Sequence, residues 1–173
     1  MDGQTHAFLA SLVGVTTMSG ELVGTKLKNL KLRMITAPNI PLDLILQNLP
    51  NLETLDASWT DLQRLPASPS EPDSSYPPKL KKLSLMSVPV KPAELSPFLS
   101  HFKDLEILHI GAIGGSEFPT LSNADLDQLT DVLKNFTKLR TVSLARNKKL
   151  GGLGGSQREL ARFVRLVGRR CQA

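Results

Sequence analysis

One nine-residue pattern occurs five times in this sequence, and it restricts the fold more than any other feature. Apolar residues occupy positions 1, 4 and 6 of the pattern, and positions 3 and 5 are mostly polar. Such alternation over a short segment indicates a strand with one buried face. The five copies therefore predict five strands, at residues 27–33, 52–58, 80–86, 105–111 and 139–145.

The spacing of the copies predicts how the strands are arranged. Successive copies start at residues 27, 52, 80, 105 and 139, so their starts are 25, 28, 25 and 34 residues apart. Periods of this length are typical of solenoids, in which each unit buries its apolar face by stacking on its neighbours. Segments that precede strands supply the expected helices, at residues 42–50, 93–102 and 124–136. Ser122, with Asp125 three residues later, is the expected N-cap of the last helix.

The L-x-x-L-x-L motif of these copies resembles the leucine-rich-repeat superfamily over about residues 27–150. The unit ADLDQLTDVLKNFTKLRTVSLARN is similar to ribonuclease-inhibitor-type repeats, and LETLDASWTDLQRL is similar to repeats of F-box substrate receptors. The resemblance implies an α/β solenoid, or horseshoe, with a parallel concave sheet and a convex side of mixed helices and loops. Position 9, usually Asn or Cys in the family, departs from the pattern and holds Ile35, Thr60, Val88, Ile113 and Asn147. Because an Asn there hydrogen-bonds loop backbone, we expect most turns to satisfy those groups differently.

The length of 173 residues fits one domain with a substantial core. We predict a single leucine-rich-repeat domain over residues 1–173. It comprises an N-terminal cap or degenerate repeat in 1–26, five repeats in 27–150 and a C-terminal capping helix in 151–173. Residues 66–78, which are rich in proline and serine, are expected to form a solvated loop.

Catalytic and metal-binding motifs are missing from the sequence. His6, His101 and His109 have no Cys, Asp or Glu at metal-ligand spacing, and no G-x-S-x-G motif occurs. We therefore predict that the protein is not an enzyme and has no cofactor. The single cysteine, Cys171, excludes an internal disulfide, and the N-terminus lacks the basic region of a signal peptide. These features predict an intracellular location, cytoplasmic or nuclear.

The resemblance implies a protein-interaction role, because leucine-rich repeats bind partners through the concave sheet. Side chains at positions 3, 5 and 7 should point there, and Trp59 follows the second strand either as an exposed hot spot or buried under the proline-rich loop. The candidate partner-binding residues are Lys31, Arg33, Asp56, Ser58, Trp59, Lys82, Ser84, Met86 and His109. The basic N-terminal end of this set predicts a partner with an acidic segment. By resemblance, the chain could be an adaptor or the substrate receptor of a ubiquitin ligase.

The closing helix gives the alternative hypothesis. Its apolar stripe consists of Leu160, Phe163, Val164 and Val167, and its opposite face carries Arg158, Arg162, Arg165 and Arg169. An amphipathic end cap with a polar outer face is the favoured interpretation. The same arginines are also candidate anion-binding residues. Together with Lys26, Lys28, Lys31 and Arg33 they would form an RNA- or phosphate-binding module, whose affinity should fall steeply as salt rises.

Overall fold

Five short parallel strands form one sheet, in the same order as in the sequence. The computed structural model describes residues 23–36, 40–67, 76–116, 118–150 and 157–168. The strands are β1 (Asn29–Lys31), β2 (Thr54–Asp56), β3 (Lys82–Ser84), β4 (Ile107–His109) and β5 (Thr141–Ser143). Each strand occupies the centre of a predicted segment and pairs in parallel with the next one, so the predicted parallel sheet is confirmed.

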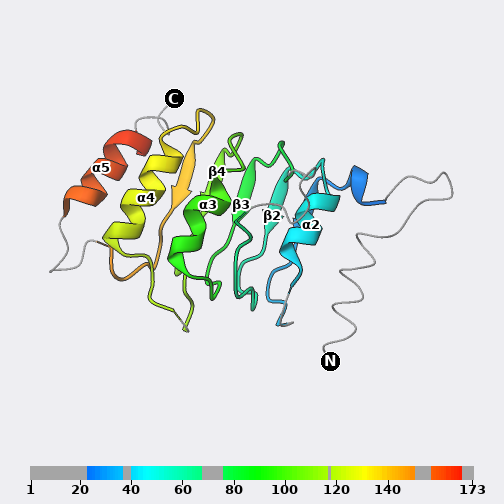
Figure 1. The fold of residues 1–173 in the computed structure, drawn as a ribbon, viewed down its shortest axis with the longest axis horizontal. Helices are drawn as coiled ribbons and strands as arrows, with labels where there is room; N and C mark the ends of the chain where they lie inside the picture. The colour runs from blue at the N-terminus through cyan, green and yellow to red at the C-terminus, as the bar shows by residue number, and fades with distance from the viewer. Residues whose placement is uncertain (1–22, 37–39, 68–75, 117, 151–156, 169–173) are drawn as a thin grey trace.

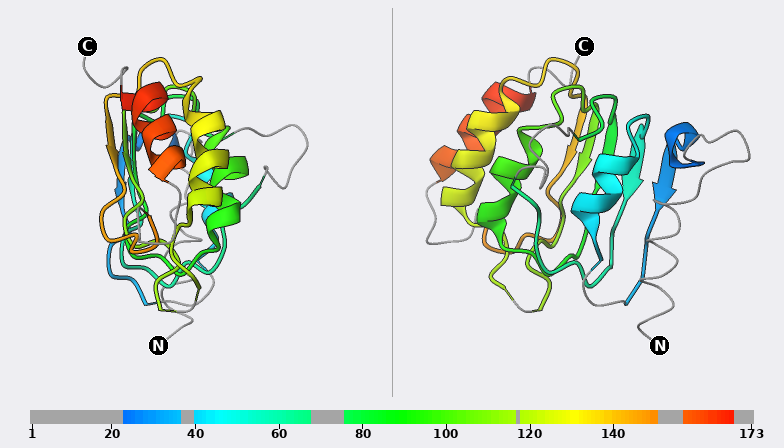
Figure 2. Two further views of the ribbon diagram at one scale, coloured as in Figure 1. Left: turned by 90° about the vertical axis from the view of Figure 1, so that its left-hand side faces the viewer. Right: turned by 45° about the vertical axis from the view of Figure 1, so that its right-hand side comes forward.

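Three helices form a second layer on one face of the sheet, α2 (Leu42–Asn48), α3 (Leu95–Leu99) and α4 (Asn123–Leu133) (Figure 1). The other helical segments are η1 (Val23–Lys26), η2 (Pro92–Glu94) and α5 (Gln157–Val167), which stands at one end of the solenoid. The end-on view in Figure 2 separates the two layers, with the strands on one side and α3 and α4 on the other. The described residues place no helix on the other face of the sheet, and this two-layer arrangement is the fold that the repeat predicts.

The core lies between the two layers and is built from the repeated apolar positions. The strand register aligns position 4 of all five repeats, namely Leu30, Leu55, Leu83, Leu108 and Val142. Leu55, Leu83 and Leu108 are fully buried, and burial of one such side chain stabilises a fold by about 1.5–3 kcal/mol. At the C-terminal end Val142 is only half-buried, because no further described repeat packs on it.

A capping box fixes the start of α4, as the sequence predicts. The Asp125 backbone N–H donates to Ser122 Oγ at 3.3 Å, and the Ser122 N–H donates to the Asp125 carboxylate at 2.9 Å. Both bonds satisfy groups that the first turn of a helix leaves unpaired. The buried side chains of Leu126, Leu129 and Leu133 then place one stripe of α4 against the core.

Both flanks of the proline-rich segment are attached to the helical layer. Tyr76 is buried, stacks on Phe102 with 5.9 Å between ring centroids, and donates a hydrogen bond of 2.6 Å to the Asp43 carboxylate. Desolvation, followed by the bond to Asp43, raises the pKa of the Tyr76 hydroxyl well above its usual value. At the other flank, His101 Nε2 donates to the carbonyl oxygen of Ala67 at 2.8 Å. Residues 68–75 of the predicted loop lie outside the described residues.

The turns after the strands differ at position 9. Asn147 is buried, and its side-chain amide donates to the carbonyl oxygens of Ile110 and Leu144, each at 2.9 Å. Its Oδ1 accepts a hydrogen bond from the Ile113 N–H at 3.2 Å. In the second repeat, the Thr60 hydroxyl donates to the Ala57 carbonyl at 2.8 Å. Thr60 thus makes one of the bonds that an Asn could make.

The closing helix α5 packs on α4 at the end of the solenoid (Figure 2). Phe163 and Val167 are buried, and Leu160 packs partly buried against the core. Val164, which the sequence pattern assigned to the same stripe, is instead 57% exposed. The predicted apolar stripe therefore included one residue too many, because α5 contacts the rest of the fold along a narrower line that leaves out Val164. The predicted N-terminal cap in 1–26 lies outside the described residues, except for η1.

Candidate partner-binding surface

The face of the sheet opposite the helices, here called the open face, carries the side chains at positions 3 and 5. Side chains alternate between the two faces of a strand, and position 4 is buried in the core, so positions 3 and 5 point away from it. The register aligns position 5 of all repeats in one row: Lys31, Asp56, Ser84, His109 and Ser143. The residues of this predicted row therefore lie side by side, although they come from five separate repeats.

Two serines of the predicted surface are not available to a partner in the manner expected. Ser58 and Ser84 are only 2% and 4% exposed, and their hydroxyl oxygens lie 2.9 Å apart. Ser58 Oγ also accepts a hydrogen bond of 3.2 Å from the Met86 N–H. Neighbouring side chains on a parallel sheet cover short ones, and this packing cannot be deduced from the repeat. We therefore correct the expectation that Ser58 and Ser84 face solvent: they link β2 to β3.

The basic residues of the open face divide into paired and free groups. The Arg33 guanidinium lies 3.6 Å from the Asp56 carboxylate, which also accepts a hydrogen bond of 3.1 Å from the Ser58 N–H. Lys31 and Lys82, by contrast, contact no acidic group among the residues that the structure describes. Lys31 is exposed and Lys82 half-buried. The free positive charge of the open face is therefore carried by these two lysines.

A ladder of alternating charges runs along position 2 of the repeats, at the N-terminal edge of the strands. Its members are Lys28, Glu53, Lys81, Glu106 and Arg140. Glu53 pairs with Lys81 at 2.8 Å and Lys28 at 3.3 Å, and Arg140 pairs with Glu106. Lys81, followed by Lys28, lowers the pKa of the Glu53 carboxyl, and Glu53 in turn raises the pKa of Lys81. The ladder was missed in the sequence, although the alternating signs at one repeat position are a visible signal.

The opposite edge of the sheet, at position 8, has an unusual backbone. The residue there has a positive φ in every repeat, and none of these residues is glycine: Met34 (60°), Trp59 (61°), Ser87 (56°), Ala112 (51°) and Arg146 (63°). Left-handed backbone is disfavoured for residues with a Cβ, so the interstrand bonds must hold it. The Trp59 N–H, for example, donates to the Met86 carbonyl at 2.8 Å. The repeat thus turns sharply at position 8 in all five units.

This turn leaves two large apolar side chains in solvent at the same edge. Met34 is 74% exposed and Trp59 is 45% exposed. They occupy the same position in neighbouring repeats, so they lie about one strand spacing, roughly 4.8 Å, apart along the edge. Of the two alternatives for Trp59, exposure is thus the one that holds. Exposed Trp and Met side chains are enriched at protein interfaces, and this pair was only partly anticipated, because Met34 had no sequence signal.

Trp59 also forms one wall of a hollow at this edge, called the Trp59 hollow. Its volume is about 490 Å³, and it is lined by Trp59, Thr60, Asp61, Ser87, Pro89, Ala112, Gly115 and Ser116. These residues come from the turns that follow β2, β3 and β4. The hollow is therefore a product of stacking three repeats, and no single repeat contains it.

His109 and Met86 complete the predicted set, and both are half-buried. His109 continues the row of Lys31 and Asp56 onto β4. The terminal methyl of Met86 lies close to Gly111, where a Cβ atom would approach the Ala145 carbonyl oxygen to 2.5 Å. Gly111 is thus required by the close approach of the next strand, and Met86 covers it.

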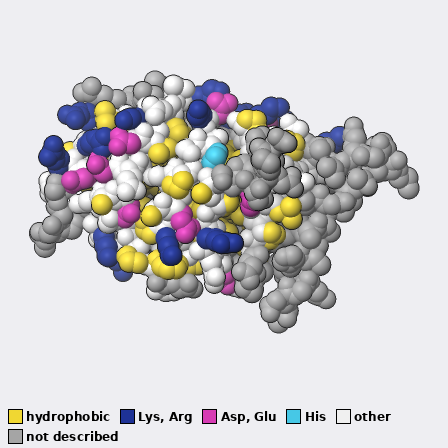
Figure 3. All heavy atoms as spheres, viewed as in Figure 1, with side chains coloured by type: hydrophobic (Ala, Val, Ile, Leu, Met, Phe, Trp, Pro, Cys, Tyr) yellow, Lys and Arg dark blue, Asp and Glu magenta, His cyan; other side chains and the backbone are white. Residues whose placement is uncertain are grey.

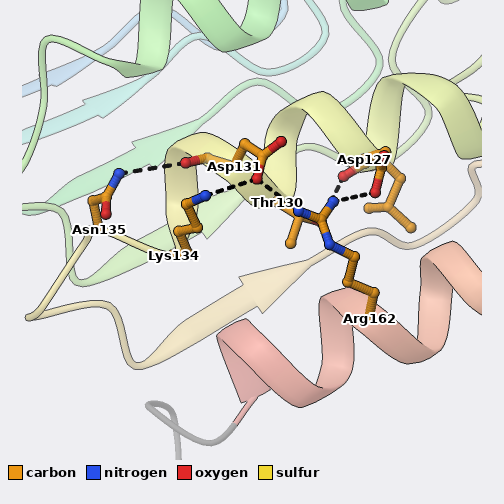
Figure 4. A network of polar contacts seen from close by, with 7 residues as sticks. Asp127, Thr130, Asp131, Lys134, Asn135 and Arg162 are labelled. Carbon is orange, nitrogen blue, oxygen red and sulfur yellow. Dashed lines mark hydrogen bonds and ion pairs between the residues drawn. The ribbon is translucent and has the colours of Figure 1, made fainter.

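The arginines of the closing helix do not form a free row. Arg162 pairs with Asp127 and, at 2.7 Å, with Asp131, both on α4 (Figure 4). Asp131 also accepts from Lys134 at 2.9 Å, and Lys134 followed by Arg162 lowers the pKa of its carboxyl. Arg162 therefore ties the cap to the last repeat. Arg158 is also engaged, Arg165 is exposed, and Arg169 lies outside the described residues. This geometry fits an end cap better than a row of anion ligands.

Other surfaces and chemistries offer less. Figure 3 shows the helix-covered face, where hydrophobic, basic and acidic side chains are interspersed. Among the described residues, no group of three or more His, Cys, Asp or Glu side chains is placed to hold a metal ion. The helices that the structure describes are all too short or too polar to cross a membrane.

Together, the parallel sheet, the helical layer and the stacked L-x-x-L-x-L units define a leucine-rich-repeat solenoid. A solved structure with a similar fold is internalin C2 from Listeria monocytogenes, a leucine-rich-repeat protein, with a TM-score of 0.52 and 15% sequence identity. The match covers 95% of this chain and 71% of internalin C2. No protein-family model and no curated protein matches the sequence. The similarity supports the leucine-rich-repeat fold, whereas the ribonuclease-inhibitor-like or F-box-like repeat type stays a prediction.

Proposed function

We propose that the chain is a non-enzymatic protein-interaction module that binds its partner through the open face. The observation that carries this proposal is the exposed apolar pair Met34 and Trp59, 74% and 45% exposed, at the edge of the open face. Lys31, three residues before Met34, has no acidic partner among the described residues. Apolar anchors next to polar, solvated positions are the usual composition of a protein interface. The fold provides a rigid support, because each strand of the face is held by its neighbours.

The charge of the open face indicates the kind of partner. Lys31 and Lys82 lie on β1 and β3 and form no ion pair with an acidic group among the described residues, and Asp56, which lies beside Lys31 in the row, is already paired with Arg33. An acidic segment crossing the strands would supply the missing opposite charge. Five strands spaced by roughly 4.8 Å span about 19 Å, which suits a short extended segment or the edge of a domain.

An adaptor role follows from this proposal, and a substrate receptor of a ubiquitin ligase is one form of it. Both functions need a selective binding face and no chemistry of their own. We also propose an intracellular setting, cytoplasmic or nuclear, because a chain with one cysteine needs no oxidising compartment for its stability.

Binding of RNA or phosphate is less well supported. Three of the cations that it would use are already paired: Lys28 with Glu53, Arg33 with Asp56, and Arg162 with Asp127 and Asp131. A phosphate ligand would have to compete with these carboxylates.

The test is affinity capture from a lysate, before and after nuclease treatment, with three forms of the protein. These are the wild type, the double variant Lys31→Glu/Lys82→Glu and the control Lys103→Glu/Lys149→Glu, which has the same net charge but changes exposed residues outside the strands. We expect the wild type and the control to capture the same protein and the open-face variant to lose it. Calorimetry with the captured protein should then show weaker, less salt-sensitive binding for Lys31→Glu/Lys82→Glu. Equal capture by all three forms would contradict the proposal, and loss of capture after nuclease treatment would favour the RNA alternative.

A further inference from the structure

The Trp59 hollow contains two kinds of lining that favour different parts of one ligand. Trp59, Pro89 and Ala112 present apolar surface, and Asp61 is the charged residue among the described residues of the lining. The Asp61 side chain is exposed and has no hydrogen-bond or ion-pair partner among the described residues. A purely apolar ligand would leave the Asp61 carboxylate without a counter-charge. An acidic ligand would be repelled by the same carboxylate.

The walls of the hollow are preformed. Gly114 has φ of +95°, and a Cβ atom there would lie 2.6 Å from the Phe118 carbonyl oxygen, so only glycine fits this turn. The Gly114 N–H donates to the Val88 carbonyl at 3.0 Å, which fixes the turn against the preceding repeat. A ligand would therefore enter a hollow whose backbone is already in place, which reduces the entropy lost on binding.

Among the residues that the structure describes, no lysine or arginine lines the hollow. Lys91, two residues after Pro89, has its ammonium group 5.8 Å from the centre of the Phe118 ring, and Arg33 is held by Asp56. Neither residue lines the hollow. Asp61 and Trp59 can therefore attract a positive charge that an external ligand brings into the hollow.

We propose that the Trp59 hollow binds an arginine or lysine side chain of the partner protein. Such a side chain is matched in both its parts: the aliphatic stem covers Trp59, Pro89 and Ala112, and the cationic head reaches Asp61. A cation over the face of an indole ring adds attraction of its own. The proposal rests on the interaction role proposed for the open face and makes it more specific. The partner segment carries a basic residue at the edge of the sheet and acidic residues over Lys31 and Lys82.

The test uses Trp59 as the reporter, since it is the only tryptophan of the chain. The probes are acetylated and amidated pentapeptides, Gly-Gly-X-Gly-Gly, in which X is Arg, Lys, Leu or Glu. The Arg and Lys peptides should shift the emission of Trp59 in a saturable manner that weakens with salt, and the Glu peptide should not. Asp61→Asn should weaken the binding of the Arg peptide by about fivefold, as expected for a partly solvated ion pair. Asp104→Asn, which removes one carboxylate from a turn before β4, should leave it unchanged.

Several results would overturn the proposal. These are stronger binding of the Leu peptide than of the Arg peptide, equal binding of the Arg peptide to wild type and Asp61→Asn, and no saturable change up to the solubility limit of the peptides. Asp61 is exposed, so loss of folding is not expected, and an unchanged circular dichroism spectrum checks this. If the peptide test failed but capture still depended on Lys31 and Lys82, only the proposed binding of a basic side chain in the Trp59 hollow would be rejected. If the peptides bound as expected but capture did not depend on Lys31 and Lys82, only the proposed docking of an acidic segment would be rejected.

Discussion

Replacing Asn147 by alanine should destabilise the solenoid more than most single changes outside the core. The Asn147 side chain is the partner of two backbone groups at fully buried residues, the Ile110 carbonyl at 2.9 Å and the Ile113 N–H at 3.2 Å. The third, the Leu144 carbonyl, keeps a weaker bond from the Asn147 N–H at 3.4 Å. Leaving one buried backbone group unpaired costs about 1–3 kcal/mol. Two such groups give an expected loss of about 3 kcal/mol in the free energy of unfolding.

Urea unfolding followed by Trp59 fluorescence and by far-ultraviolet circular dichroism measures this loss. The two probes should give coincident transitions if the solenoid unfolds as one unit. The control is Thr60→Val, which removes one hydroxyl at the same repeat position and leaves one carbonyl, that of Ala57, without its bond. We expect this variant to lose about half as much as Asn147→Ala.

A further variant, Asn147→Asp, separates hydrogen bonding from packing. A carboxylate at residue 147 can still accept from the Ile113 N–H, but only its protonated form can donate to the Ile110 carbonyl. The folded-state pKa of this Asp should therefore be raised. The variant should be closest to wild type below the unfolded-state pKa and should lose stability as pH rises through the folded-state value. If Asn147→Ala and Thr60→Val unfolded at the wild-type urea concentration, the account of the position 9 turns would be wrong.

Three further changes test other parts of the fold. Arg146 has φ of +63°, which glycine adopts more easily than residues with a Cβ. The Arg146→Gly variant should therefore be more stable than Arg146→Val by about 1–2 kcal/mol. The reverse order of melting temperatures would show that this backbone is not left-handed. Phe163→Asp should destabilise by several kcal/mol, of the order of 3–5, because Phe163 is a buried side chain of the cap helix α5, and an unchanged melting temperature would mean an undocked α5. Nuclear magnetic resonance titration should give Glu53 a pKa below its ordinary value, so its contribution to stability is lost as pH falls through that pKa. Lys81→Met should raise the Glu53 pKa, and an unaffected value would contradict the charge ladder.

The repeat predicts the fold because two short-range rules suffice for it. Alternation within each copy gives a strand with one buried face, and the constant offset between copies aligns equal positions, such as Leu55 with Leu83. The capping box of Ser122 and Asp125 is likewise local, so sequence spacing alone identifies it. Features of this kind depend on residues that are close in the chain or related by the period.

The surface was predictable only in part, because exposure depends on neighbours in space. Ser58 and Ser84 follow the same repeat rule as Lys31, yet they are buried, because short side chains on adjacent strands are covered and bond to each other. Arg162 belongs to a regular arginine row, but the approach of α4 to α5 gives it two carboxylate partners. The left-handed turn that exposes Met34 has no signal in the sequence, since none of the five residues at position 8 is glycine.

Site-specific photocrosslinking tests most directly the claim that the partner binds the open face. A benzoylphenylalanine would replace Thr54, which lies on β2 at position 3, and in a second form Leu44, which is 42% exposed on α2 in the helical layer. Irradiation in nuclease-treated lysate should join the Thr54 form to one protein partner, and the Leu44 form to none. The Lys31→Glu/Lys82→Glu background should remove the Thr54 crosslink. A crosslink from Leu44 with none from Thr54 would contradict the account and assign binding to the helical face.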